Sequence, residues 1–278
     1  MEENRLLKIS CYIIAFNEKE KIADAIASVQ WADEVVVADS HSTDGTTEIA
    51  QAMGARVVQI PFLGYGDLRN RAIAACQGDW IFSLDADERC TPEARDEILS
   101  ILQSSDALDA YYVPRRNYFM GRWIKHSGYY PDYRQPQLFR KGVMTFRFDS
   151  VHEAYDLSSR KVGFLQNPIW QFPFKDLEQI LHKCNRYSTL GAEKLYLQQR
   201  KASPGSALSH GLWAFIHQYL IKRGFLDGWP GFVLALSHFE ATFYKYAKLY
   251  VRQAHWPWPR INPSEPASKS KGGVDGCD

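Results

Sequence analysis

Residues 80–88 read Trp80-Ile81-Phe82-Ser83-Leu84-Asp85-Ala86-Asp87-Glu88, an apolar run that passes directly into three acids. The apolar part, residues 80–84, is short and rich in β-forming side chains, which predicts a strand buried on both faces of a sheet. Carboxylates directly behind such a strand are costly unless they are paired or bind a metal ion. The stretch therefore predicts a parallel strand that delivers acidic side chains to a polar site.

The segments before residue 80 alternate between strand and helix patterns. Strands are predicted over residues 9–16, 34–38 and 55–60, and helices over residues 19–30, 46–53 and 68–76. Gly54 follows the second helix and is placed to end it. This alternation predicts an α/β fold, with a mostly parallel, Rossmann-like sheet and helices on both of its faces.

The rest of the chain changes character twice. Thr91 and Pro92 are placed as the N-cap and the first residue of a helix that runs to about Gln103. Residues 110–153 have strand and loop patterns, and helical patterns extend from about residue 176 to 253. The proline-rich tail from Trp256 is expected to be disordered.

The composition limits the class of protein. The formal net charge is +1, so the overall balance does not indicate a nucleic-acid partner. Five cysteines are scattered without the spacing of a zinc site, which is typical of a reducing compartment. The first residues lack the apolar core of a signal peptide, and no apolar stretch of about 18 residues predicts a membrane span. We therefore expect a cytoplasmic protein.

Three predicted strands end in polar residues. These ends are Asn17-Glu18, Asp39-Ser40 and Asp85-Ala86-Asp87. Because an open parallel sheet binds its ligands beyond the carboxyl ends of its strands, the three ends are expected to form one site. The Asp-x-Asp spacing can place one acid on a divalent cation and the other on a ribose hydroxyl, and Mg²⁺ or Mn²⁺ suits these oxygen ligands.

Each candidate residue also has a plainer interpretation. The two acids of the Asp-x-Asp motif could form a solvated turn that caps the next helix. Asp39 could contact a nucleoside, or it could cap the turn through residues 42–45, which is rich in turn-forming side chains. Asn70 and Arg71, on a predicted helix, could face a base or phosphate groups, or they could face the solvent. We predict the binding role for Asp39, Asn70 and Arg71.

Four motifs together resemble the inverting family 2 glycosyltransferases, which have the GT-A fold. The motifs are Ile13-Ile14-Ala15-Phe16-Asn17-Glu18, Val37-Ala38-Asp39-Ser40-His41-Ser42-Thr43-Asp44-Gly45-Thr46, Arg69-Asn70-Arg71-Ala72 and Gly78-Asp79-Trp80-Ile81-Phe82-Ser83-Leu84-Asp85-Ala86-Asp87-Glu88. The resemblance covers about residues 8–155. Further stretches more narrowly resemble the bacterial lipopolysaccharide-core branch, which is similar to β-1,4-glucosyltransferases that act on inner-core heptose. These are Tyr129-Tyr130-Pro131-Asp132, Gln137-Leu138-Phe139-Arg140, Val151-His152-Glu153 and Gly224-Phe225-Leu226-Asp227-Gly228-Trp229-Pro230-Gly231.

The resemblance implies a role for each strand end. Ala15 and Glu18 would lie beside the nucleotide of a UDP-sugar donor, Asp39 would hold the base, and Asp85 would hold the ribose. Asp87 would bind the Mg²⁺ or Mn²⁺ ion that bridges the diphosphate. The implied reaction transfers a hexose, glucose by resemblance, to a hydroxyl group of a lipid-linked oligosaccharide such as the lipopolysaccharide inner core.

An inverting transfer also needs a general base that deprotonates the acceptor hydroxyl. Residues 149–153 follow a predicted strand and offer two acids and a histidine. Glu153 is the first candidate for the base, as the resemblance also implies, and Asp149 is the second. Alternatively, His152 and Glu153 form a structural pair that positions a loop.

Three basic residues are candidates for neutralising a diphosphate leaving group. Arg134, Arg140 and Lys141 could take this role, or each could be a surface residue. The segment 134–137 departs from the Arg-Leu-Phe pattern that we expect of the family, which leaves the role of Arg134 open.

The chain is expected to have three parts. Residues 1–155 form the GT-A nucleotide-sugar-binding and catalytic core, residues 156–255 form a helical C-terminal extension that faces the acceptor or a membrane, and residues 256–278 form the disordered tail. Aromatic, apolar and basic residues at helical spacing in the extension suit a peripheral contact with a membrane. The same pattern also suits packing on the catalytic core or a dimer interface.

Other classes of protein fit part of the same pattern. A haloacid-dehalogenase-like phosphatase also places Asp-x-Asp at a strand end with Mg²⁺, but near its N-terminus and with a Thr or Val soon after. A non-catalytic nucleotide-sugar binder would keep the same binding residues. A nucleotidyltransferase would need a glycine-rich, lysine-containing loop after the first strand, and residues 15–21 contain no glycine.

Overall fold

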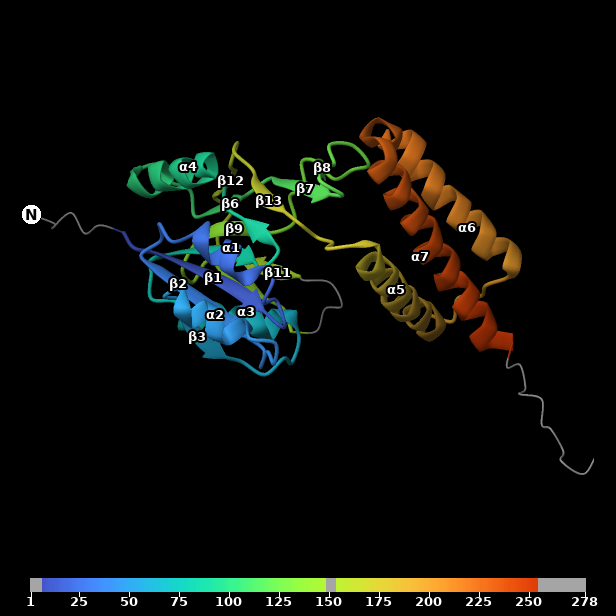
Figure 1. The fold of residues 1–278 in the computed structure, drawn as a ribbon, viewed down its shortest axis with the longest axis horizontal. Coiled ribbons are helices and arrows are strands. Elements are labelled where there is room, and N and C mark those ends of the chain that lie inside the picture. The colour runs from blue at the N-terminus through green and yellow to red at the C-terminus, as the bar shows by residue number, and fades with distance from the viewer. Residues whose placement is uncertain (1–6, 149–153, 255–278) are drawn as a thin grey trace, which may run out of the picture.

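The computed structural model describes residues 7–148 and 154–254. Its main element is a seven-stranded sheet with the strand order β12-β6-β9-β4-β1-β2-β3 (Figure 1). Its strands are β1 (Ile9–Ala15), β2 (Glu34–Asp39), β3 (Arg56–Gln59), β4 (Trp80–Asp85), β6 (Ala110–Tyr112), β9 (Pro136–Arg140) and β12 (Val162–Phe164). Within this sheet only β9 runs antiparallel to its neighbours, β4 and β6. The predicted mostly parallel α/β sheet is therefore confirmed.

The register of β1 brings three strand ends to one edge of the sheet. Ala15 lies opposite Asp39 of β2, and Ile14 lies opposite Asp85 of β4. Because the three strands are parallel, the chain leaves all of them on the same side of the sheet. The polar residues that follow these strands therefore start from adjacent positions, as the switch-point rule requires.

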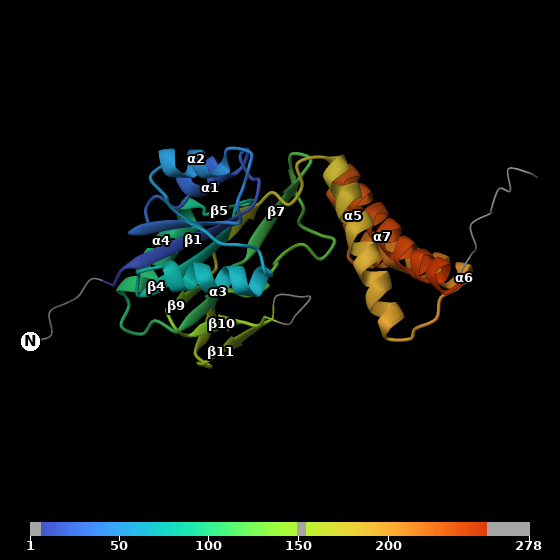
Figure 2. The same cartoon turned by 90° about the horizontal axis from the view of Figure 1, so that it is seen from below.

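Helices cover both faces of the sheet, and each face has its own apolar core. The helices are α1 (Ile22–Ala27), α2 (Thr46–Ala52), α3 (Tyr65–Ala75) and α4 (Pro92–Gln103). Figure 2 shows α1 and α2 on the face opposite α3. Ile13 belongs to the core under α1, α2 and α4, whereas its neighbour Tyr12 belongs to the core under α3. The apolar run of β1 is therefore explained by a strand that is buried on both sides.

The helix ends follow the predicted signals. Thr91 caps α4, since its Oγ1 accepts a hydrogen bond from the backbone N–H of Ala94 at 3.1 Å, and Pro92 is the first helical residue. Gly54 lies just beyond α2 with φ of +82°, a conformation that favours glycine. Two of the predicted helix boundaries are thus explained by local chemistry alone.

The region after residue 155 differs from the prediction of a helical segment. β11 (Tyr155–Leu157) pairs with β10 (Met144–Phe146), and β12 joins the main sheet beside β6. β13 (Ile169–Gln171) lies in a second sheet of order β5-β13-β7-β8, whose other strands are β5 (Glu88–Arg89), β7 (Arg115–Phe119) and β8 (Arg122–Trp123). Strands as short as β11, β12 and β13 show no detectable alternation in the sequence. The helices of this region begin at residue 177, which agrees with the helical pattern predicted from about residue 176 and lies after the expected domain boundary at residue 156.

The C-terminal helical region is a bundle joined by two short helical turns. Its elements are α5 (Leu177–Leu197), α6 (Pro204–Ile216), the π-helical η1 (His217–Ile221), the 3₁₀ turn η2 (Gly224–Asp227) and α7 (Gly228–Ala254). α7 packs against both α5 and α6, and the bundle lies to one side of the sheets (Figures 1 and 2). A small apolar cluster of Phe119, Ile124, Ile180 and Leu234 joins it to the second sheet.

Asp227 fastens the bundle to the turn after β8. Its buried carboxylate accepts hydrogen bonds from the backbone N–H groups of Lys125 at 3.1 Å and His126 at 3.0 Å. Gly231 packs so closely on Gly224 that an added Cβ would lie 2.0 Å from the Gly224 carbonyl oxygen. The glycine-rich stretch 224–231 is therefore a tight junction between two helices, and we call it the Asp227 junction.

Many apolar side chains of the bundle are exposed. We call one group of them the apolar set: Leu208, Leu212, Trp213, Ile216, Leu220, Ile221, Phe225, Leu226 and Trp229. Lys222 and Arg223 lie within the same segment and are also exposed. In the parts of the chain that the structure describes, no helix combines the length and the apolarity needed to cross a bilayer.

Candidate functional site

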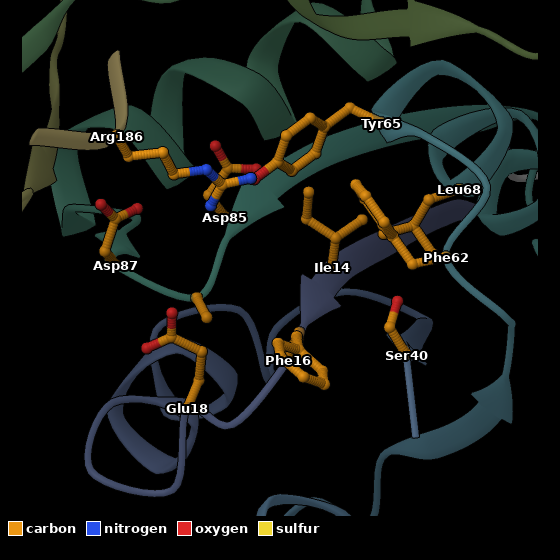
Figure 3. A pocket seen from close by; sticks show the side chains of 12 residues that line it. Ile14, Phe16, Glu18, Ser40, Phe62, Tyr65, Leu68, Asp85, Asp87 and Arg186 are labelled. Atoms are coloured by element: carbon orange, nitrogen blue, oxygen red, sulfur yellow. The ribbon is translucent and has the colours of Figure 1, made fainter. Parts of the chain in front are cut away.

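A cleft of about 430 Å³ lies at the carboxyl edge of the main sheet (Figure 3). It is lined by Ile14, Ala15, Phe16, Glu18, Ser40, Phe62, Tyr65, Leu68, Asp85, Ala86, Asp87 and Arg186. These residues come from the ends of β1, β2 and β4, from α3 and the loop before it, and from α5. The structure thus brings together four of the residues that the sequence singles out, namely Ala15, Glu18, Asp85 and Asp87.

Asp85 is held by a buried arginine. Arg69 of α3 donates from Nη2 to Oδ1 of Asp85 at 2.9 Å and from Nη1 to Oγ of Ser83 at 3.3 Å. Burial alone would raise the pKa of Asp85, but the positive charges of Arg69 and Arg115 hold this pKa below its usual value. Asp85 is therefore a fixed, charged hydrogen-bond acceptor at neutral pH.

Glu88 has a structural role. It is fully buried, and its Oε1 accepts a hydrogen bond from Nε of Arg115 at 2.6 Å. Its Oε2 accepts from Nε2 of Gln137 at 2.9 Å and from the backbone N–H of Asp85 at 3.0 Å. Glu88 therefore uses both oxygens to shape the turn that presents Asp85 and Asp87.

Asp87 faces the cleft without an ion-pair partner among the described residues. Its only side-chain hydrogen bond there is a long one, from Nε2 of Gln171 at 3.5 Å. Burial, followed by the negative charges of Asp85 and Glu88, raises the pKa of Asp87 to about 7. The negative charge of ionised Asp87 is thus not fully balanced by nearby positive charge, and a bound cation would balance it.

The loop after β1 is fixed by the loop after β2. The backbone N–H of Glu18 donates to Oγ1 of Thr46 at 2.9 Å, and that of Asn17 donates to Oγ of Ser42 at 2.8 Å. The Glu18 side chain pairs with Lys21 at 3.2 Å. Ala15 and Glu18 therefore line the cleft on a loop that is ordered before any ligand binds.

Asp39 does not present its carboxylate to the cleft. It is fully buried, and its Oδ2 accepts hydrogen bonds from the backbone N–H of Ser42 at 3.0 Å, Oγ1 of Thr47 at 2.9 Å and Nε2 of Gln59 at 2.9 Å. Ser40 is the residue from the end of β2 that lines the cleft. The plainer interpretation of Asp39, a cap for the following turn, describes its contacts in this structure.

Asn70 and Arg71 also lie outside the cleft. The Asn70 amide makes two hydrogen bonds with the backbone of Phe146, at 2.8 and 2.9 Å, and so fastens β10 to α3. Arg71 is exposed and pairs with Asp67 at 3.6 Å, one turn away. The residue of this motif that reaches the strand-end acid Asp85 is their neighbour Arg69, which the sequence reasoning did not select.

The signal for Arg69 was present in the helical spacing. Leu68, Ala72 and Ile73 define the buried face of α3, and Arg69 lies on that face one turn before Ile73. An arginine on the apolar face of a helix requires a buried carboxylate partner. That requirement points to a strand-end acid such as Asp85.

The three basic residues considered for the leaving group, Arg134, Arg140 and Lys141, do not lie together. Arg140 lies beside Trp80, at the amino end of β4, where its guanidinium stacks on the indole ring. Lys141 donates from Nζ to the backbone oxygen of Cys76. The sequence left these two residues open between a role at the leaving group and a surface position, and the structure places them at the amino end of β4, opposite the cleft. Arg134 pairs with Asp132 at 2.7 Å, and its charge acts on Asp85 and Glu88.

The two candidates for the general base, Asp149 and Glu153, lie outside the described residues, as does His152. The predicted tail from residue 256 lies outside them as well. Arg186, in contrast, lines the cleft from α5 and was not selected from the sequence. Its position on a helix more than 90 residues after the Asp-x-Asp motif gives no local sequence signal.

The described residues contain no cluster of three or more His, Cys, Asp or Glu side chains that could hold a metal ion. Mg²⁺ and Mn²⁺ do not need one, because they bind through one or two carboxylates together with substrate phosphates and water. Asp87 fits this chemistry, since it faces the cleft and forms no ion pair with a cation of residues 7–148 or 154–254. Asp85 fits it less well, because Arg69 already binds it.

The fold is that of an α/β protein with a cleft at the carboxyl edge of a mostly parallel sheet, the edge at which such sheets bind their ligands. A sequence model described as "Glycosyl transferase family 2" matches residues 10–158, more than half of the chain, and the chain belongs to that family. It is 34% identical to an uncharacterized glycosyltransferase of Rickettsia prowazekii, over 87% of this chain and 86% of that protein. The protein is therefore a glycosyltransferase.

Two further similarities come from a curated relative and a solved structure. The chain is 29% identical to the lipopolysaccharide core biosynthesis glycosyltransferase LpsC of Rhizobium meliloti, over 92% of this chain and 97% of that protein. Glucosyl-3-phosphoglycerate synthase from Mycobacterium tuberculosis, solved with Mn²⁺, UDP and glucosyl-3-phosphoglycerate, is 30% identical over 40% of this chain and 44% of that chain, with a TM-score of 0.36. The structural overlap is too small to carry the ligands of that enzyme over to this protein.

Proposed function

We propose that this glycosyltransferase moves a hexose from a UDP-sugar to a hydroxyl group of a lipid-linked saccharide, with inversion at the anomeric carbon. The observation that carries the proposal is the shared cleft of Ala15, Glu18, Asp85 and Asp87. These residues come from two strand ends far apart in the sequence and meet at the edge where α/β sheets bind nucleotides. Glucose as the sugar, and the lipopolysaccharide inner core as the acceptor, follow the family resemblance and the name of the Rhizobium relative.

Four residues of the cleft hold the donor in this proposal. Ala15 and Glu18 contact the nucleotide on their pre-ordered loop. Asp85 accepts a hydrogen bond from the ribose, because Arg69 keeps its carboxylate charged and fixed. Asp39 supports this arrangement from behind by holding the loop after β2.

Asp87 would hold an Mg²⁺ or Mn²⁺ ion. When bound, such an ion supplies positive charge that stabilises the leaving diphosphate. Ion binding would also relieve the crowding of carboxylates that raises the pKa of Asp87. Glu88 is excluded as a ligand, since both of its oxygens serve the protein.

An inverting transfer needs a base that takes a proton from the acceptor hydroxyl. Glu153 is the first candidate and Asp149 the second, and both assignments rest on the sequence. The activated oxygen attacks the anomeric carbon from the face opposite the leaving diphosphate, so that one displacement inverts the configuration. The proton passes to the base, and no covalent glycosyl-enzyme forms.

The helical bundle would bring the enzyme to its lipid-linked acceptor. The exposed apolar set, together with Lys222 and Arg223, has the composition of a peripheral membrane contact. Buried free thiols such as Cys11 and Cys76 are compatible with a reducing compartment, and we place the enzyme at the cytoplasmic face of a membrane.

A donor screen tests the assignment. Purified protein is mixed with Mn²⁺ or Mg²⁺ and a panel of nucleoside diphosphates and nucleotide-sugars, and thermal unfolding is followed. We expect UDP and UDP-sugars to stabilise the protein in a metal-dependent way that Asp87→Asn removes. The matched control is Asp106→Asn, an exposed acid away from the cleft. Stabilisation by another nucleotide only would disprove the uridine assignment.

The same preparation separates the rival classes. Turnover of a generic phosphate ester without nucleotide-sugar would indicate a phosphatase. Metal-dependent binding of UDP-sugars without transfer to any lipid-linked saccharide would indicate a non-catalytic binder. Flotation with vesicles containing anionic lipid tests the membrane contact, and recovery only in the lipid-free fraction would contradict it.

A further inference from the structure

Among the described residues that line the cleft, Arg186 alone comes from the helical bundle. Figure 3 shows its side chain reaching over the cleft toward Asp85, with Asp87 beside it. Every other lining residue belongs to the sheet, to α3 or to the loops between them. Arg186 therefore forms a second wall of the cleft, opposite the strand ends.

The position of α5 is set by the same turn that carries the acids. The backbone N–H of Phe172 donates to the backbone oxygen of Asp87 at 2.8 Å, next to the pairing of β13 with β5. Lys175 then binds Glu20, in the loop after β1, at 2.7 Å. The side chain of Asp176 caps α5 by accepting from the N–H of Gln179 at 2.8 Å. The helix thus starts from fixed points on both acidic strand ends.

Arg186 lies about 14 Å along α5 from its first residue, at the usual rise per residue. One turn earlier, Lys183 points to the same part of the protein, since it donates to the Pro173 oxygen at 2.9 Å and its charge acts on Asp87. α5 therefore directs two positive charges toward the acidic end of β4.

The guanidinium of Arg186 is available for a ligand. No ion pair joins it to a carboxylate in the described part of the chain, although Asp85 and Asp87 line the same cleft. Asp85 is already bound by Arg69. An arginine in this position has several N–H donors in a planar fork, which matches the oxygens of a phosphate group.

We propose that Arg186 binds the diphosphate of the donor, so that the helical bundle supplies part of the donor site. The proposal rests on the proposed function, since it requires a nucleoside diphosphate in the cleft. Negative charge builds up on the diphosphate as the bond to the anomeric carbon breaks, and the guanidinium stays protonated throughout. Arg186 therefore binds the donor and also stabilises the leaving group.

The experiment compares three ligands that differ only in their phosphates. Binding of UDP, UMP and uridine in the presence of Mn²⁺ is measured by calorimetry for the full-length wild type, Arg186→Gln and Arg186→Lys. Lys194→Gln is the matched control, an exposed cation on the same helix outside the cleft. We expect Arg186→Gln to weaken UDP by about 10- to 100-fold, the usual effect of a lost charge-assisted hydrogen bond. Arg186→Lys should recover part of this loss, and binding of UMP and uridine should change by less than about twofold.

Several results would overturn the assignment. UDP binding that is unchanged in Arg186→Gln would exclude the contact. An equal loss for UDP, UMP and uridine would indicate a displaced helix instead. Unchanged UDP binding in Arg186→Gln, combined with a raised KM for the saccharide in a transfer assay, would indicate that Arg186 contacts the acceptor instead.

The binding data also distinguish a failure of the proposed function from a failure of the Arg186 assignment. If the wild type binds another nucleoside diphosphate in place of UDP, the uridine assignment falls. The same comparison of diphosphate, monophosphate and nucleoside then tests Arg186 with that base. If the wild type binds no nucleoside diphosphate, both proposals fall.

Discussion

The acidic edge of the sheet and the helical bundle treat their side chains in opposite ways. At the edge, charged groups are buried and most have specific partners, such as Arg69 with Asp85 and Arg115 with Glu88. In the bundle, large apolar groups such as Trp213 and Trp229 are exposed. The first region has the character of a site for one small polar ligand, as in the proposed function, and the second exposes a broad apolar surface.

The largest expected effect comes from breaking the buried pair of Glu88 and Arg115. Glu88→Gln leaves the Arg115 guanidinium buried without a counter-charge, which should cost about 3–5 kcal/mol of the free energy of unfolding. Urea unfolding followed by tryptophan fluorescence measures this. The control is Glu93→Gln on the exposed side of α4, which should change it by less than about 0.5 kcal/mol. A loss as small as that of the control would show that Glu88 is not the structural centre of the turn.

Asp87 should behave in the opposite way, because in the proposed function it binds a ligand rather than another part of the protein. Asp87→Asn should reduce sugar transfer by about 10²–10³-fold, the usual effect of removing one charge-stabilising group. It should leave the free energy of unfolding unchanged or raised. Initial rates and unfolding curves of the same preparation check both statements. A strongly destabilised variant would mean that Asp87 is structural, like Glu88.

The pH dependence of stability sharpens this contrast. The folded-state pKa of Asp87 is about 7, above the value of about 4 for an unfolded chain. Ionisation of Asp87 therefore lowers the free energy of unfolding, and this loss builds up as the pH rises from about 4 to about 7. Without metal, wild type relative to Asp87→Asn should become less stable over this range. A difference that is independent of pH would contradict the raised pKa.

A smaller effect is expected at the Asp227 junction. Asp227→Ala leaves the N–H groups of Lys125 and His126 without their acceptor, which should cost about 1–3 kcal/mol. Hydrogen exchange should accelerate at these two amides before it accelerates in β1. Equal acceleration in both places would show that the bundle and the sheet unfold as one unit.

The smallest effect is expected in the apolar set. Trp229→Ser should weaken the association with anionic vesicles by about fivefold, since one exposed aromatic side chain contributes only part of a broad contact. Flotation measures this, and Leu63→Ser is the control, since Leu63 is an apolar residue of the loop before α3 that is even more exposed than Trp229. An equal loss of vesicle association in Trp229→Ser and Leu63→Ser would show that the apolar set does not contact lipid more than other exposed apolar residues do.

Much of the α/β part could be predicted from local patterns. The buried strands, the Thr91 cap and the Gly54 terminus each have a short-range cause, and the register of parallel strands then collects the strand ends at one edge. Ala15, Glu18, Asp85 and Asp87 could be placed in one cleft for this reason. The short strands β11 to β13 could not be predicted, because tertiary pairing rather than periodicity defines them.

The errors at the site concern residues whose role depends on long-range partners. Arg140 and Lys141 follow an antiparallel strand, so their distance from the cleft depends on the direction of β9. Asn70 and Arg69 are neighbours on α3, and the apolar face of the helix, on which Arg69 lies, was the sequence signal that Arg69 rather than Asn70 meets Asp85. The position of Arg186 at the cleft depends on the path of the chain from β13 to α5, and no local sequence pattern predicts that path.

The hydrogen bond between Phe172 and Asp87 limits how far the bundle can move. α5 starts at Leu177, five positions after Phe172, and a fully extended segment of that length spans at most about 18 Å. If the bundle rests on a bilayer, the sheet edge would therefore stay within this distance of the first turn of α5. Lengthening this segment by inserted glycines would let the two parts drift, so catalysis on a membrane-bound acceptor would suffer more than catalysis on a soluble one.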